Sequence, residues 1–187
     1  MSNTILHADD IARVKELLGL KHLEVHLRPS WGSQTPGFRE EIHGDLKTLM
    51  GKAYPLCDAS ISHCQTLGGF ALAQFEYDRL LQLGFDIEET ERVSSQVARR
   101  VCQSADEFEQ APSAASLWTA KEAAFKALKG ANQPKIVAQI VLTSWTQIDS
   151  QIETVEVANS ADFKFTKIFG VVLKKNPYSF AFFICIP

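Results

Sequence analysis

The chain has 187 residues, enough for one domain with a substantial core or for two small halves folded together. Hydrophobic residues make up 45% and charged residues 22%, as in ordinary globular proteins, and a net charge of −3 argues against general nucleic-acid binding. No apolar run approaches the roughly 20 residues of a membrane helix, and the amino terminus lacks the basic and apolar regions of a signal peptide. We therefore expect a cytoplasmic protein with reduced cysteines, without a membrane or nucleic-acid partner.

The first part of the chain has the pattern of two amphipathic helices and three short strands. Helical spacing predicts a helix over Asp9–Leu18, with Asp9 or Asp10 as N-cap and Gly19 as its end. A second helix is predicted over Phe38–Met50, closed by Gly51. Strands are predicted over Leu23–Leu27, Ala59–His63 and Phe70–Phe75.

Apolar and polar side chains alternate over Leu80–Glu88, which predicts a strand with one apolar and one polar face. Asp86 and Glu88 share the polar face, with Cα atoms roughly 6 to 7 Å apart, close enough to bind one cation. Gly84, one polar-face step earlier, leaves room for a ligand or another backbone. A strand running into a solvated acidic turn explains the same pattern, because further glutamates follow.

The strongest helical pattern runs over Ala114–Lys129, after the possible N-cap Ser113. Trp118, Glu122 and Lys126 are spaced by four residues and therefore share a face of this helix. An exposed Glu–Lys pair is one explanation of that spacing. The other is a phosphate site, where Glu122 holds a cation and Lys126 reaches phosphate oxygens that the cation also binds.

Shorter helices are expected before this one, over Ser94–Cys102 and Ser104–Ala111, and strands after it. The last strand is apolar on both faces and is expected to be central in its sheet. We expect an α+β fold of two halves, about 1–78 and 79–187, each a helix packed on an antiparallel sheet within one domain, although the sequence shows only a weak echo between the halves and no strong internal repeat. The final strands are predicted over Lys135–Trp145, Gln151–Ala158, Phe163–Leu173 and Tyr178–Ile186.

Two motifs resemble the signatures of the 4'-phosphopantetheinyl transferase superfamily. Gly84–Glu88 matches Gly-x-Asp-x-Glu, and Trp118–Lys126 matches Trp-x-x-Lys-Glu-Ala-x-x-Lys, both without gaps. Upstream, Gly51–Lys52 and Ser60–Cys64 are similar to the Gly-Lys-Pro and Ile-Ser-His-Ser elements of the branch that activates nonribosomal peptide and polyketide synthases. The resemblance covers about residues 51–130.

The resemblance implies a set of roles for matched residues. The Mg²⁺ ligands implied by the resemblance would be Asp86, Glu88 and Glu122. Lys126 and His63 would contact the phosphates of coenzyme A. Lys52 would help to bind these phosphates. Glu122 and Lys126 would also be the catalytic residues.

The reaction implied is attack by a serine hydroxyl of an acyl or peptidyl carrier protein on the β-phosphate of coenzyme A, with 3',5'-ADP leaving. The serine proton needs an acceptor, and Glu122, Asp106, Glu107 or a metal-bound water could serve. Because both halves lie in one chain, the resemblance also implies a monomer.

The chain departs from the family pattern at several positions. Ala53 replaces a proline, Cys64 replaces a serine, and Gln65–Leu67 resembles an insertion before Gly68–Gly69. A non-catalytic relative that binds coenzyme A or a carrier protein is therefore an alternative, as is another Mg²⁺-dependent phosphoryl enzyme. Candidates for binding the 3'-phosphate are Lys21, Arg28 and Arg39.

Overall fold

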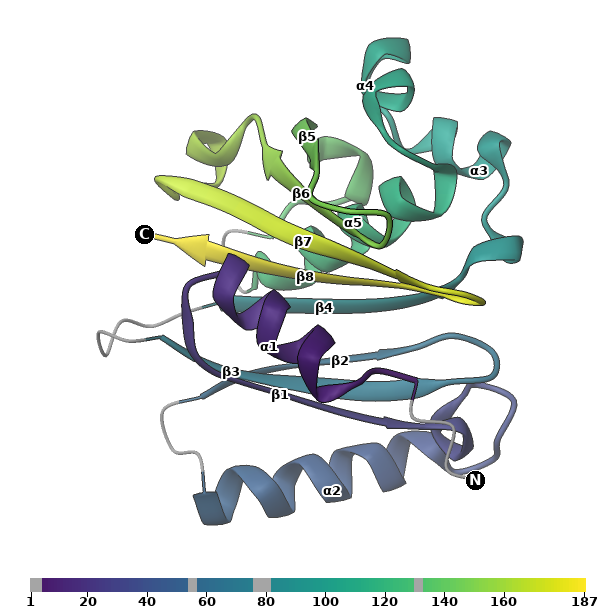
Figure 1. Cartoon of the computed structure of the whole chain (residues 1–187), viewed down its shortest axis with the longest axis vertical. Coiled ribbons are helices and arrows are strands. Elements are labelled where there is room, and N and C mark those ends of the chain that lie inside the picture. Colours follow the sequence, from purple (N-terminus) through teal and green to yellow (C-terminus); the bar gives the residue numbers. More distant parts are fainter. Residues whose placement is uncertain (1–4, 54–56, 76–81, 130–132) are drawn as a thin grey trace.

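The computed structural model describes residues 5–53, 57–75, 82–129 and 133–187, and only the backbone of Lys52 and Ala53. Two antiparallel sheets make up its centre, which confirms the α+β prediction (Figure 1). In the first sheet, β1 (Leu20–Arg28), β3 (Gly68–Phe75) and β2 (Asp58–His63) lie in that order. The second sheet has the order β4 (Gln82–Glu89), β8 (Tyr178–Ile186), β7 (Lys167–Lys175), β6 (Ile152–Val157) and β5 (Leu142–Gln147).

Helix α1 (Ala8–Leu17) begins one residue before the predicted helix. The predicted N-cap is wrong: His7 is the cap, and Asp10 lies in the first turn, where its Oδ2 accepts the His7 N–H at 2.9 Å. Gly19 follows the helix with a φ of +63°, a conformation that glycine adopts without strain, so the predicted end is confirmed.

Helix α2 (Phe38–Ala53) runs past Gly51, where we predicted its end. A lone glycine costs a helix only about 1 kcal/mol, and this is too little to stop it. Trp31 in the 3-10 turn η1 (Pro29–Trp31) and Ile42 of α2 pack with Phe70 and Leu72 of β3. Helix α2 thus covers the outer face of the first sheet (Figure 1).

Three helices precede the last strands of the second sheet: α3 (Ser95–Arg100), α4 (Ala105–Gln110) and α5 (Ala114–Ala127). Each begins after a serine whose hydroxyl accepts a backbone N–H of the first turn, and this confirms Ser113 as the cap of α5. A 3-10 turn, η2 (Thr90–Arg92), links β4 to this group.

Two predicted strands begin later than expected. Residues before β5 form the 3-10 turn η4 (Val137–Gln139), because the Gln139 side chain accepts the backbone N–H groups of Lys135 and Ile136. Before β7, η5 (Ser160–Phe163) ends at Lys164, whose φ of +64° interrupts extended backbone.

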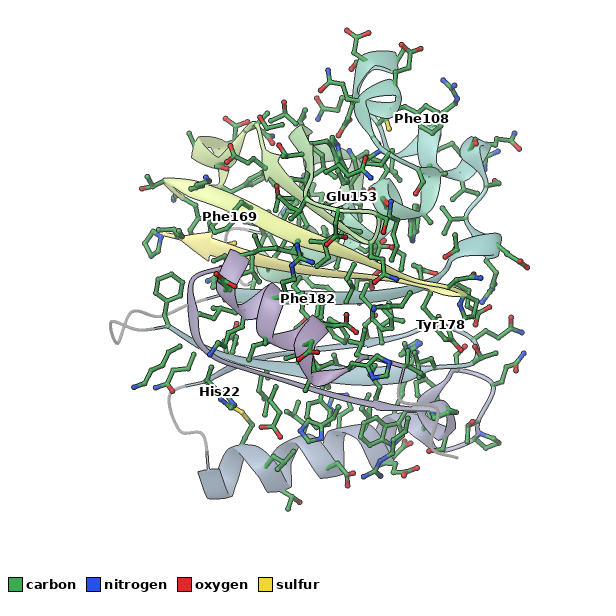
Figure 2. The ribbon with its side chains drawn as sticks, viewed as in Figure 1. His22, Phe108, Glu153, Phe169, Tyr178 and Phe182 are labelled. Atoms are coloured by element: carbon green, nitrogen blue, oxygen red, sulfur yellow. The ribbon has the colours of Figure 1, made fainter. Side chains whose placement is uncertain are left out.

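The last strand, β8, pairs with both β4 and β7, so its predicted interior place is confirmed. One face of β8 packs with β4, α1 and the first sheet in a shared core that includes Phe182, labelled in Figure 2. Its other face packs against α5. Helix α1 lies in front of the line where the sheets meet (Figure 1). No helix in the described ranges is both long and apolar enough to cross a membrane.

Several predictions fall outside the described residues. These are the boundary at residues 78 and 79, the first two residues of the strand predicted over Leu80–Glu88, and the side chain of Lys52.

Candidate active site

The acids of β4 lie on the face that packs against α5. Gly84 lies on the same face, where the sequence predicted room for a ligand or for another backbone. A Cβ at Gly84 would lie 2.5 Å from the backbone nitrogen of Ala127 and closer still to the Ala123 oxygen. The close neighbour is therefore the backbone of α5. This contact seats α5 directly on β4 and places its polar side chains near Asp86 and Glu88.

Lys126 and Trp118 of α5 both bond to these acids. The Lys126 Nζ lies 2.6 Å from Asp86 Oδ1, and the Trp118 Nε1 donates to Glu88 Oε1 at 3.1 Å. Asp86 is only 3% exposed, and its Oδ2 is buried with no hydrogen-bond partner in the described part of the chain. The shared face predicted for Trp118, Glu122 and Lys126 thus turns toward β4, and the exposed-pair explanation does not hold for Lys126.

The three acids repel one another in a partly desolvated space. Burial, and then the charge of Asp86, raise the pKa of Glu88 to about 7. The same two causes raise the pKa of Glu122. Burial raises the pKa of Asp86 despite the nearby Lys126 ammonium. The site holds more negative charge than Lys126 balances.

A divalent cation such as Mg²⁺ fits these residues in donor type and charge, because it prefers carboxylate oxygens and would relieve their repulsion. The buried, unpartnered Asp86 Oδ2 is a ready donor. Among the described residues, however, no three His, Cys, Asp or Glu side chains are grouped as a preformed metal site. Cation binding at Asp86 Oδ2 therefore requires the side chains of the acids to draw together, and binding through Oδ1 as well would require the Lys126 ammonium to leave that oxygen.

His63 ends β2 in positive surroundings. Burial and the charges of Lys126 and Arg39 lower its pKa, and the Phe38 ring meets its imidazole edge-on at 4.6 Å. A cavity of about 240 Å³ opens beside His63 and Glu88. It is lined from the first half by Ser33, His63, Cys64 and Gln65, and from the second by Glu88, Arg92, Val93, Val97 and Trp118.

The residues Gln65–Leu67 form the tight turn between β2 and β3, while Gly68 and Gly69 belong to β3 itself. Thr66 reaches the second half, where its N–H and hydroxyl donate to Glu89 Oε1 at 2.9 and 2.7 Å. Its Oγ1 also lies 2.9 Å from the hydroxyl of Tyr178, the first residue of β8, which is labelled in Figure 2. The apparent insertion therefore joins the halves beside the cavity.

Glu107 and Lys121 form a buried ion pair away from the cavity. The Lys121 Nζ lies 2.7 Å from Glu107 Oε1 and donates to the carbonyls of Val101 and Ile140 at 2.6 Å. Both Glu107 oxygens also accept backbone N–H groups. Glu107 is thus unavailable as a proton acceptor, whereas Asp106 is exposed on α4.

Two of the candidates for the 3'-phosphate lie near His63. Arg39 is close enough to affect the His63 pKa. Arg28 is already paired, with Glu41 and with Asp45 at 2.9 Å. Lys21 lies near the other end of β1. In the pairing of β1 with β3, Arg28 lies opposite Gly68 and Leu20 lies opposite Phe75.

Ser62 is the site residue that the sequence did not single out. Its hydroxyl donates to Asp86 Oδ1 at 2.7 Å and accepts from the Lys126 Nζ at 2.9 Å. The sequence feature that could have indicated Ser62 is its position next to His63 in the Ser-His element.

Fold and site together define a class: α+β proteins in which an acidic strand and a lysine-bearing helix meet beside a cavity between two antiparallel sheets. A model of the 4'-phosphopantetheinyl transferase superfamily matches residues 82–182, which include β4 and α5. The chain belongs to this superfamily, as its motifs predicted, and phosphopantetheine transfer with coenzyme A and a carrier protein as partners is the activity of that family. A comparison with curated proteins found no match.

Proposed function

We propose that this protein transfers 4'-phosphopantetheine from coenzyme A to a serine of an acyl or peptidyl carrier protein, as a Mg²⁺-dependent cytoplasmic monomer. The observation that carries the proposal is the contact of Lys126 with Asp86, within electrostatic reach of Glu88 and Glu122, in a chain of this superfamily. The repulsion among these acids supports the binding of a cation, which would relieve it.

Asp86, Glu88 and Glu122 would hold Mg²⁺. When bound, the ion supplies positive charge that neutralises the diphosphate oxygens. Lys126 would bind the same phosphates after leaving Asp86, and His63 would contact them from β2. The positive neighbours of His63 support an anion there, with Arg39 the best placed of the candidates for the 3'-phosphate. Lys52 joins this set on the strength of the motif alone.

The transfer forms a bond between the serine oxygen and the β-phosphorus and breaks the bond from that phosphorus to the bridging oxygen, which leaves with 3',5'-ADP. Such a reaction depends on positioning and on stabilising charge. The serine proton needs an acceptor. Of the three carboxylate candidates we assign this role to Glu122, because Glu107 is engaged at both oxygens and Asp106 is exposed on α4.

Incubation with an apo carrier protein, coenzyme A and MgCl₂, followed by mass spectrometry of the carrier, tests this function. We expect the carrier to gain one phosphopantetheine, and a chelator to prevent it. Asp86→Ala should abolish transfer without unfolding the chain. Activity of this variant close to that of the natural protein would remove Asp86 from the metal site.

A second candidate is a non-catalytic relative that binds coenzyme A or a carrier protein. The Lys126–Asp86 pair, which occupies an oxygen that a cation would use, favours it. Calorimetric titration with coenzyme A distinguishes the two: binding without modification of any tested carrier supports the second candidate.

A further inference from the structure

Strands β2 and β4 are joined by side chains instead of a backbone ladder. Alternate residues of β2 accept the backbone N–H groups of alternate residues of β4, each pair 25 positions apart. The pairs are Asp58 Oδ2 with Leu83 at 2.6 Å, Ser60 Oγ with Phe85 at 2.9 Å, and Ser62 Oγ with Ile87 at 3.1 Å. We call this contact the seam.

Ser60 and Ser62 are equivalent within the seam and differ outside it. Both are buried, with 6% and 2% of their surface exposed, and both accept one N–H from β4. Only Ser62 also bonds to Asp86 and Lys126. The hydroxyl of Ser62 therefore has three partners, and two of them are side chains of the candidate active site.

The three bonds place Ser62 where it restrains Asp86 from the opposite half of the molecule. Its donated hydrogen bond occupies Asp86 Oδ1 and leaves Oδ2 without a partner. When Lys126 leaves Asp86, the Ser62 hydroxyl remains to hold the carboxylate in orientation. Partners that orient metal ligands in this way commonly change metal affinity about 10- to 100-fold when removed.

We propose that Ser62 is a positioning residue, which orients Asp86 for the cation and holds Lys126 ready for the phosphates. This inference rests on the proposed function, because it requires that Asp86 binds a cation. Ser60 is then a seam residue without influence on the site.

Mn²⁺, which like Mg²⁺ prefers oxygen ligands, is the probe, and electron paramagnetic resonance measures its free concentration during titration. We expect Ser62→Ala to weaken Mn²⁺ binding about tenfold or more, and Ser60→Ala to change it less than about twofold. Each variant leaves one β4 N–H unpaired, and Ser62→Ala should lose more thermal stability than Ser60→Ala because it also removes the bonds to Asp86 and Lys126. Should Ser62→Ala fail to fold, Ser62→Cys fills the site with a slightly larger side chain that is a weaker hydrogen-bond donor and is expected to weaken binding in the same direction.

Equal Mn²⁺ affinity in the Ser60 and Ser62 variants, with tight binding by the natural protein, would overturn the role of Ser62 alone. No Mn²⁺ binding by the natural protein would overturn the proposed function and this inference with it.

Discussion

Lys126 is bound to Asp86 and Ser62, although the proposed reaction needs its ammonium group at the phosphates. The pair must open when substrate and cation arrive. In the protein without ligands, Lys126 instead offsets the repulsion among the acids of β4 and α5. Removal of Lys126 should therefore lower the stability of the protein without ligands and increase the stabilisation that a bound cation gives.

We expect Lys126→Ala to melt at a lower temperature than the natural protein at pH 8 and to gain more from added MgCl₂, because the ion then replaces the lost charge. Transfer should fall about 100-fold or more, since a group that stabilises phosphate charge is gone. Thermal melts with and without MgCl₂, and initial transfer rates, measure this. The matched control is Lys129→Ala, whose lysine pairs with Asp58 at 2.7 Å, and an equal MgCl₂ effect in both variants would contradict the explanation.

The Cys64 thiol lies beside the cavity but is buried, and its Sγ donates to the Leu67 carbonyl. Burial raises its pKa to about 11, so almost no thiolate exists at pH 8. We expect iodoacetamide at pH 8 to modify the part-buried Cys102 well before Cys64, as peptide mass spectrometry would resolve. Rapid alkylation of Cys64 in the folded protein would show that its burial is incomplete.

Local pattern predicted the acids and the lysine, because alternation and four-residue spacing report which residues share a face. It did not predict their partners. The bonds of Ser62 depend on β2 lying beside β4, and the buried pair of Lys121 with Glu107 depends on how α4 meets α5. Both are tertiary contacts, and no short-range period encodes them.

The contact between β4 and α5 depends on small residues. Gly84 faces the α5 backbone, and the alanines of α5 at this contact are fully buried. We expect Gly84→Ala to lower the free energy of unfolding by about 1–3 kcal/mol, because the added methyl group forces the helix and strand apart. Chemical denaturation measures the change.

Gly44 of α2 is the matched control, since a Cβ there would meet no heavy atom of the described residues within 4 Å outside the backbone of its own helix. Gly44→Ala should stabilise the protein by about 0.5–1 kcal/mol through its helix propensity. If Gly84→Ala were equally harmless, the close approach of α5 to β4 would be wrong.

Most helices and strands were predictable, and the errors lie mainly at their ends. Helix α2 continued through Gly51 because one unfavourable residue is outweighed by its neighbours. The late start of β5 followed from a single side chain, Gln139, which no hydrophobic period reveals.

Helix α1 connects the two sheets electrostatically as well as through the core. Asp10 Oδ1 lies 2.8 Å from the Lys175 Nζ at the end of β7, and Arg13 pairs with Asp149 before β6. Burial alone would raise the Asp10 pKa, but hydrogen bonds from Lys175 and the His7 N–H outweigh it and hold the pKa below the ordinary 3.8. The pair therefore adds stability above that value and loses it as pH falls through the lowered pKa.

We expect Asp10→Asn to unfold more easily than the natural protein at pH 7, by about 1 kcal/mol, and the difference to shrink as the pH falls below about 4. Denaturant titrations at several pH values measure it. Asp9→Asn, an exposed acid in the same turn, serves as control and should show little change at any pH. A difference for Asp10→Asn that persists undiminished at low pH would assign the effect to packing.

The seam limits how β2 and β4 could align if they belonged to two separate polypeptides. Its hydroxyl and carboxylate acceptors recur at every second residue of β2 and meet every second N–H of β4. A slip of one residue would bring Ala59 and Ile61, which carry no acceptor, against those N–H groups. A slip of two residues would match only two of the three N–H groups with an acceptor. Two fragments made as separate polypeptides would thus have one alignment that satisfies all three, and that alignment would rebuild the acidic centre.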